Sequence, residues 1–337
     1  ELGEEPFAIL VDESSDISHK GQLALWLRYV DALGRPCEHF IGVVHVDDNS
    51  SLSLKDAIEA LLVSHGLTMT RIRGQGYDGA SNMRGDIKGL KTLIMQESPS
   101  AYYVHCFAHQ LQLVLVVVAK GNNDCVWFFD QVTLLLNIVG VSCKRHGMLR
   151  DARLENLMKS LECGELETGR GLNQEMGLPR PGETRWGSYY KTICNIITMY
   201  PVIRDVLMIL GEDTTIRSDW TRIHSMLGAF ESFDFVFDAY LMFVILGYTN
   251  DLSVCLQRRE QDIINAISLV NVAKRRMQQL RLDGWDQFLQ RITSFCNKHD
   301  ILVPTMDGNY KPYGRSSRFV HKQTNDDHFK REVYIGC

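Results

Sequence analysis

A short apolar run that breaks into acidic and hydroxyl residues does most to limit what this chain can fold into. Phe7 to Val11 are all apolar, and Asp12 to Asp16 follow as acids separated by serines. An uninterrupted run of this kind is typical of a strand buried on both faces of a sheet. Asp12 would then lie at the carboxyl end of a rigid element, where a metal-binding carboxylate is most useful. The alternative is a solvated turn at 12–16 that caps the next element.

Two further strands follow, and helices and strands then alternate. Residues 22–31 and 38–46 are predicted as strands joined by a turn. Residues 53–65 have the apolar spacing of an amphipathic helix, and Gly66 stands where its C-terminal cap belongs. A strand, a helix and a strand are predicted next, at 71–78, 87–96 and 101–105. This order predicts an α/β fold with a mixed sheet of the RNase H-like type, in which carboxylates from the first and fourth strands approach each other.

From Cys106 onward helical patterns dominate. The predicted helices are 107–120, 125–145, 153–161, 189–210, 218–246 and 260–281. In the last of them Ile263, Ile267 and Val270 are predicted to pack on neighbouring helices. The predicted domains are therefore an RNase H-like core at 1–105, a large all-α insertion at 106–299 and a return segment at 300–337. Residues 162–184 are rich in glycine and proline and are predicted to form a long loop.

Composition and charge narrow the class of protein. The nine cysteines form no CxxC pair and no signal peptide is visible, which predicts an intracellular protein with reduced thiols. The longest apolar stretch, at 233–248, is interrupted by Asp234 and Asp238, so we expect no membrane partner. The net charge is −6 over 1–104, −4 over 105–257 and +5 over 258–337. This asymmetry fits a carboxylate site followed by a phosphate-contacting surface, and it fits ordinary scatter as well.

Asp12 and Asp78 are the first candidate site, because each follows a predicted strand. Two adjacent carboxylates repel each other, and a divalent cation such as Mg²⁺ or Mn²⁺ removes that cost by binding both. Such a pair can serve in-line displacement at phosphorus, with metal ions about 4 Å apart. Glu13 and Asp16 could add ligands unless strand alternation points them away. The alternative for Asp78 is a turn former ahead of Gly79.

Two further motifs carry polar residues of recognisable chemistry. Cys106 and His109 share a helix face directly after the predicted fifth strand. No second Cys/His pair has matching spacing, so a histidine directed at a phosphate or at the carboxylates is a better interpretation than a structural zinc. Arg185 can bind phosphate bidentately, and Trp186 can stack on an unpaired base. The alternative for Trp186 is an anchor in the core below the next helix.

Together and in this order, these pieces resemble the hAT superfamily of DNA transposases. More narrowly they resemble transposase-like proteins of the zinc-finger MYM-type protein 1-like and TTF-type zinc-finger groups. The matching stretches are FAILVDESSDIS (Phe7–Ser18), GQGYDGASNMRG (Gly74–Gly85), YYVHCFAHQLQL (Tyr102–Leu113) and ETRWGSYY (Glu183–Tyr190). The resemblance covers essentially the whole chain. It implies an RNase H-like core split by a helical insertion, as the element order predicts.

The resemblance also implies roles for individual residues. Asp12 and Asp78 match the first two members of the family's Asp-Asp-Glu metal triad. Cys106 and His109 match its Cys-x-x-His element, with the histidine near the scissile phosphate. Arg185 and Trp186 match its Arg-Trp element, in which the tryptophan stabilises a flipped-out base. The partner is then DNA rather than a small-molecule substrate, and the compartment is the nucleus.

One departure from the family pattern limits the expected activity. The triad's glutamate belongs to a Ser-Glu-Arg-like motif near the family's dimerisation region, and the chain reaches Cys337 before such a motif. Glu332 is the only late acid in a helix-like setting, and its context does not match. We therefore expect a truncated catalytic core, inactive alone, with weak or no Mg²⁺ or Mn²⁺ binding and with any homo-oligomer interface missing. The alternative is a domesticated nuclear module that binds DNA or protein without catalysis.

Overall fold

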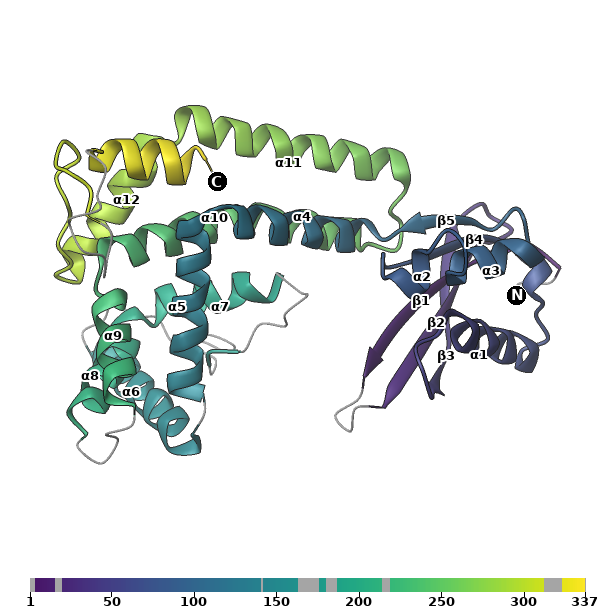
Figure 1. Cartoon of the computed structure of the whole chain (residues 1–337), viewed down its shortest axis with the longest axis horizontal. Coiled ribbons are helices and arrows are strands. Elements are labelled where there is room, and N and C mark those ends of the chain that lie inside the picture. Colours follow the sequence, from purple (N-terminus) through teal and green to yellow (C-terminus); the bar gives the residue numbers. More distant parts are fainter. Residues whose placement is uncertain are drawn as a thin grey trace. The chain divides into compact units, whose positions relative to one another are not determined.

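Five strands form one mixed sheet in the order β3-β2-β1-β4-β5. β1 pairs antiparallel with β2, which pairs antiparallel with β3, whereas β4 lies parallel to β1 and β5 parallel to β4 (Figure 1). The strands are β1 Phe7–Ser15, β2 Gly21–Val30, β3 Pro36–Val46, β4 Ile72–Tyr77 and β5 Tyr102–His105. The predicted α/β class and the place of β1 beside β4 are thus confirmed.

The computed structural model describes residues 4–15, 20–140, 142–162, 176–179, 187–213, 219–311 and 323–336. It divides into two units. We call residues 1–113 with 253–267 the sheet unit, and residues 114–252 with 268–337 the helical unit.

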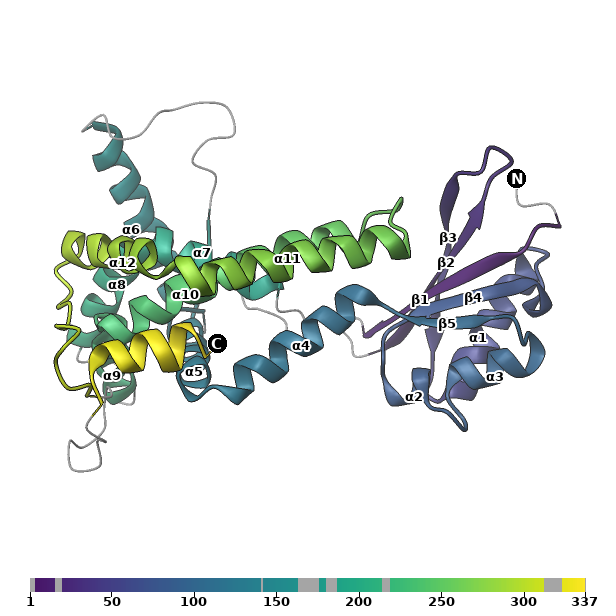
Figure 2. The same ribbon diagram turned by 90° about the horizontal axis from the view of Figure 1, so that it is seen from above.

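Helices cover one face of the sheet. The sheet unit contains α1 Ser51–Ser64, a 3₁₀ turn Met69–Arg71, α2 Ser81–Arg84 and α3 Leu90–Glu97. Figures 1 and 2 show α1 and α3 on the same side of the strands. Their buried residues Leu54, Ile58 and Ile94 share one core with Ile9 and Leu25. About 25 cal/mol per Å² of buried apolar surface stabilises this layer.

Burial alternates along β1. Phe7, Ile9 and Val11 are buried, but Ala8 and Leu10 are only partly so. The prediction of a strand fully buried on both faces is therefore wrong, because α1 and α3 cover only the face that carries the odd-numbered residues.

The end of α1 follows the predicted cap. Gly66 has a φ of +70°, which glycine adopts without a Cβ clash. Its N–H donates to Val63 O, and Leu67 N–H donates to Leu62 O at 2.9 Å. This pair of bonds is a Schellman motif, and it turns the chain back towards β4.

The helical unit is built around α10. α4 Phe107–Gly121 runs from the sheet unit into it. The other helices are α5 Asn123–Gly140, α6 Cys143–Glu162, α7 Gly187–Thr198, α8 Tyr200–Glu212, α9 Trp220–Phe230, α10 Phe233–Leu256, α11 Ile263–Asp283, α12 Trp285–Lys298 and the π-helical η3 Asp327–Tyr334. Phe235 of α10 lies 5.3 Å from Phe128 and 5.1 Å from Phe230, ring centre to ring centre.

By length and composition alone, α10 could cross a membrane. It has 24 residues and a mean hydropathy of 1.4, and the bent pairs α5–α6 and α7–α8 pass the same test if each is one span. In the structure, Phe235, Val236 and Phe237 of α10 are buried in the helical core. That packing accounts for much of the helix's apolar character.

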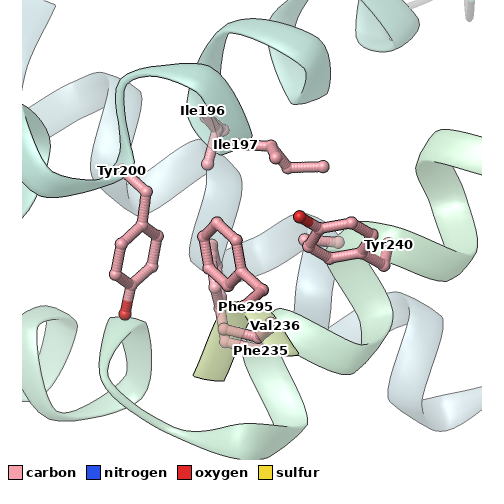
Figure 3. Close-up of a pocket in the computed structure, with 8 residues that line it drawn as sticks. Ile196, Ile197, Tyr200, Phe235, Val236, Tyr240 and Phe295 are labelled. Carbon is pink, nitrogen blue, oxygen red and sulfur yellow. The ribbon is translucent and has the colours of Figure 1, made fainter. Parts of the chain in front are cut away.

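The helical core is closely filled. Figure 3 shows Phe295 between Tyr200 and Tyr240, and its ring centre lies 5.1 Å and 5.3 Å from theirs. The cavity beside these rings has about 10 Å³, which is the space of a single water. It is lined by apolar and aromatic side chains, so we regard it as a packing defect and not as a ligand site.

Candidate functional site

The two candidate aspartates lie at one end of the sheet, on neighbouring strands. The parallel register pairs Leu10 with Gly76, and two residues further along each chain come Asp12 and Asp78. Adjacent strands are about 4.8 Å apart, so carboxylates at matched positions can reach one cation. Asp12 is exposed and Asp78 half-buried. The structure therefore brings these two predicted residues together.

Asp12 does not lie where the apolar run indicated. β1 continues to Ser15, and Asp12 pairs with Ala24 of β2. The hairpin partner β2 holds this polar continuation in the strand, although its composition resembles a turn. β4 ends at Tyr77, so Asp78 lies just past the end of its strand, as predicted.

Glu13 is a third carboxylate at this end of the sheet. Burial raises its pKa, and the negative charges of Asp78 and Asp12 raise it further, while a bond from the Asn82 amide lowers it. That amide lies 3.4 Å from Glu13 Oε2 and donates to Asn49 O at 2.9 Å. The three acids thus repel one another, which is the condition that a bound cation would relieve.

Backbone and side-chain bonds fix the turn that carries Asp78. Its Oδ1 accepts a bond from Ala80 N–H at 3.0 Å, and the Tyr103 hydroxyl donates to its carbonyl at 2.6 Å. Gln75, which is 1% exposed, accepts a 2.6 Å bond from the Tyr77 hydroxyl just before this turn. The turn-forming alternative for Asp78 is therefore realised as well, and it leaves one carboxylate oxygen for other partners.

The Cys-x-x-His element begins at the neighbouring strand end. His105 pairs with Tyr77, and Cys106 N–H donates to Tyr77 O at 3.0 Å. Cys106 is exposed and His109 half-buried in the first turn of α4. Both lie in the sheet unit with the two aspartates, at the same end of the sheet.

His105 is the residue that sequence reasoning missed. Its ring packs on Gly79, where a Cβ would lie 2.7 Å from the ring's Cε1, and it lies 5.4 Å from the His109 ring. Its Nε2 is buried and has no partner in the part of the chain that the structure describes. Burial, with His109 and Arg84, lowers the pKa of His105 against the opposing effect of Asp78, which favours a neutral imidazole. Its place opposite Tyr77 in the parallel pair is the signal that could have found it.

Arg185 and Trp186 fall outside the described residues, so their predicted roles remain predictions. Glu332 lies on η3 of the helical unit, where its carboxylate is 3.4 Å from His328 Nδ1.

The donor set fits a hard divalent cation in part. Carboxylate oxygens are the ligands that Mg²⁺ and Mn²⁺ prefer, and Asp12 and Asp78 supply them from adjacent strands. Among the residues described, no group of three His, Cys, Asp or Glu side chains is arranged to hold a metal ion. Two protein ligands leave several positions for water or a phosphate oxygen, as is usual for Mg²⁺.

Comparisons with known proteins point to the same class. Residues 1–89 match the family model of the ZMYM1/FAM200 RNase-like domain, a span that contains both aspartates. The chain is also similar to proteins named "52 kDa repressor of the inhibitor of the protein kinase" from Homo sapiens and Mus musculus. Each is 21% identical over 98% of this chain, and the chain spans 42% of the length of each. These findings support a hAT-like, transposase-derived protein with an RNase-like domain, as the four motifs predicted.

Proposed function

We propose that the sheet unit binds DNA through a divalent cation held by Asp12 and Asp78. The observation that supports the proposal is the β1–β4 register, which pairs Leu10 with Gly76, two residues before Asp12 and Asp78, at the end of the sheet where β5 leads into Cys106 and His109. A cation there would supply positive charge to a phosphate oxygen and acidity to a bound water. His109 would hold a neighbouring phosphate oxygen, and the protein would act on DNA in the nucleus.

We further propose that the site binds but does not cut DNA on its own. Among the described residues of the sheet unit, Asp12 and Asp78 supply two carboxylates with Glu13 on the opposite face, whereas the family that the motifs resemble uses three. Losing one ligand of a two-metal site removes most of the rate. Arg185 and Trp186 are proposed to bind phosphate and base, as the match of their motif implies.

DNA affinity measured with and without Mn²⁺ tests the proposal. We expect Mn²⁺ to strengthen binding of a hairpin DNA to the wild-type chain and to have no effect on the Asp12→Ala/Asp78→Ala variant. Asp47→Asn is the matched control, because the Asp47 side chain is 99% exposed at the end of β3. A wild-type affinity that does not respond to Mn²⁺ would contradict the metal site. Efficient strand cleavage that Asp12→Ala abolishes would overturn the proposal that the chain only binds.

A second candidate is a domesticated regulatory module without any metal role. It is favoured by the relatives, whose printed name describes a repressor. In that case DNA or protein affinity would be the same for wild type and for the Asp12→Ala/Asp78→Ala variant. The Mn²⁺ experiment thus separates the two candidates, and a fluorescently tagged full chain tests the nuclear location.

A further inference from the structure

α11 is a long basic helix whose only acid is its last residue, Asp283. It spans 21 residues, and from Ile263 to Leu282 it contains four cations and not one aspartate or glutamate. We call Lys274, Arg275, Arg276 and Arg281 the basic row. All four side chains are exposed. Buried Ala266 and Ala273 mark the opposite, core-facing side of the helix.

Helical periodicity spreads the row around the solvent side of α11. At 100° per residue, Lys274 and Arg281 lie within about 20° of each other on one flank, and Arg275 lies about 100° from Lys274, opposite the line of Ala266 and Ala273. Arg276 lies on the other flank. The charges therefore project into solvent along the helix and are not turned towards the core.

The basic row has no acidic partners in the described structure. Arg28 pairs with Glu38 at 2.9 Å, and Arg145 pairs with Asp219 at 2.8 Å. No described carboxylate forms an ion pair with any member of the row. Its charged groups are thus free of direct ion pairs among the described residues, which leaves them available to a polyanion.

The row also has a defined end. A cavity of about 350 Å³ at this end of α11 is lined by Arg281 itself, with Lys330, Asp283 and Asp286 among its other lining residues. The Lys330 ammonium lies 5.6 Å from the Trp285 ring centre, so it is held at the cavity wall. Arg281 is therefore the member of the row that shares its surroundings with acids, and the row ends there.

We propose that the basic row binds the phosphate backbone of duplex DNA. Lys274 and Arg281 are about 10 Å apart along the axis, the rise of seven helical residues. One DNA strand carries a phosphate about every 3.4 Å of axis, so this spacing spans about three phosphates. Lysine and arginine contacts to phosphate carry no sequence information, so binding is sequence-independent. DNA as the partner rests on the proposed function, but the basic row lies in the helical unit and the carboxylates in the sheet unit.

The salt dependence of duplex binding tests this proposal on the full chain. Affinity for a random-sequence duplex of about 30 base pairs is measured in EDTA between 50 and 200 mM salt. Each phosphate contact adds about 0.9 to the slope of log affinity against log salt, so K274Q/R275Q/R281Q lowers the slope by about 2.7. The wild type then loses about 40-fold more affinity across this range than the variant does.

Three further chains make the result decisive. The matched control K144Q/R150Q/K159Q removes three exposed cations of α6 in the same unit, and the charge-preserving K274R/R275K/R281K must keep the wild-type slope. The Asp12→Asn/Asp78→Asn variant must also keep it, since EDTA removes any metal contribution. An unchanged slope in the triple α11 variant, or an equal drop in the α6 control, overturns the proposal that the basic row contacts phosphates. Competition by polyglutamate as effective as duplex DNA at equal charge overturns DNA as its partner.

Discussion

Substituting Gln75 by leucine should loosen the support beneath Asp78. Gln75 is 1% exposed on β4, three residues before that aspartate. Its amide donates to Ala101 O at 2.7 Å and to Lys91 O at 3.1 Å, and its Oε1 accepts the Tyr77 hydroxyl at 2.6 Å. One side chain therefore ties β4 to α3, to the residue before β5 and to its own neighbour in the strand.

The cost of the substitution follows from the groups it leaves unpaired. Gln75→Leu removes three hydrogen bonds, those to the Lys91 and Ala101 carbonyls and that from the Tyr77 hydroxyl, and each such loss at a buried group costs about 1–3 kcal/mol. We expect a loss of about 3 kcal/mol or more in the free energy of unfolding. Burial raises the pKa of Tyr77, so its hydroxyl stays a donor at any pH used in the assay.

A double-mutant cycle with Tyr77→Phe isolates the central bond. Tyr77→Phe alone leaves only Gln75 Oε1 unpaired, but in the double variant the hydroxyl no longer needs a partner. The loss of unfolding free energy in the double variant should therefore be smaller than the sum of the two single losses, by about 1 kcal/mol. Hydrogen exchange of β4 and β5 amides in increasing urea measures this locally. Gln96→Leu on α3 is the control, because Gln96 is exposed. Its free energy of unfolding should stay within about 0.5 kcal/mol of the wild-type value. A Gln75→Leu loss no larger than that control, or strict additivity, would refute the reasoning.

Two more substitutions test the site and the helical core. Gly79→Ala should displace the His105 ring and lower the free energy of unfolding by about 1–3 kcal/mol. Gly121→Ala at the end of α4 should not destabilise the fold, because an added Cβ there meets no other atom. Thermal unfolding compares the two variants. Burial raises the pKa of Asp234, and the hydrogen bond from the Tyr310 hydroxyl, which lowers that pKa, offsets the rise only in part. The folded state then binds more protons than the unfolded state, so stability should fall as pH rises from about 4. Asp234→Asn should flatten that fall in urea titrations, and an unchanged pH slope would contradict it.

Local patterns identified much of the sheet unit. The strand predicted at 22–31 is present as β2, with Leu23, Leu25 and Leu27 buried at alternate positions, and the amphipathic spacing of α1 matches its buried Leu54 and Ile58. Asp12 was assigned to the end of a strand because sequence cannot show that β2 extends the hairpin past it. Such long-range pairing, and not local propensity, decides where a strand ends.

Helix boundaries in the second half were less predictable. Residues 189–210 were predicted as one helix, but the chain breaks before Tyr200, where Pro201 lacks an N–H to continue it. The predicted helix at 218–246 also breaks, where Ser232 Oγ accepts Phe235 N–H at 3.2 Å and starts α10. α12 was not predicted at all, although its buried residues recur at helical spacing.

The apolar stripe of α11 shows a second limit of sequence patterns. Ile263 and Ile267 were predicted to pack on neighbouring helices, but they are 59% and 56% exposed. An apolar period identifies a helix face and cannot say whether another element covers it. In the candidate site, motif spacing predicted Asp12 and Asp78, whereas His105 is recognised from its pairing opposite Tyr77 and its packing on Gly79, which are both properties of the folded chain.

The central claim is that Asp12 and Asp78 share one divalent cation, and Mn²⁺ binding followed by electron paramagnetic resonance tests it most directly. Free Mn²⁺ is titrated with the wild-type chain, Asp12→Asn, Asp78→Asn and the exposed control Asp47→Asn. We predict one Mn²⁺ site in the wild type and the control, and an affinity at least about tenfold weaker in each single variant, because either loss breaks the pair. Equal affinity in all four chains would contradict the account.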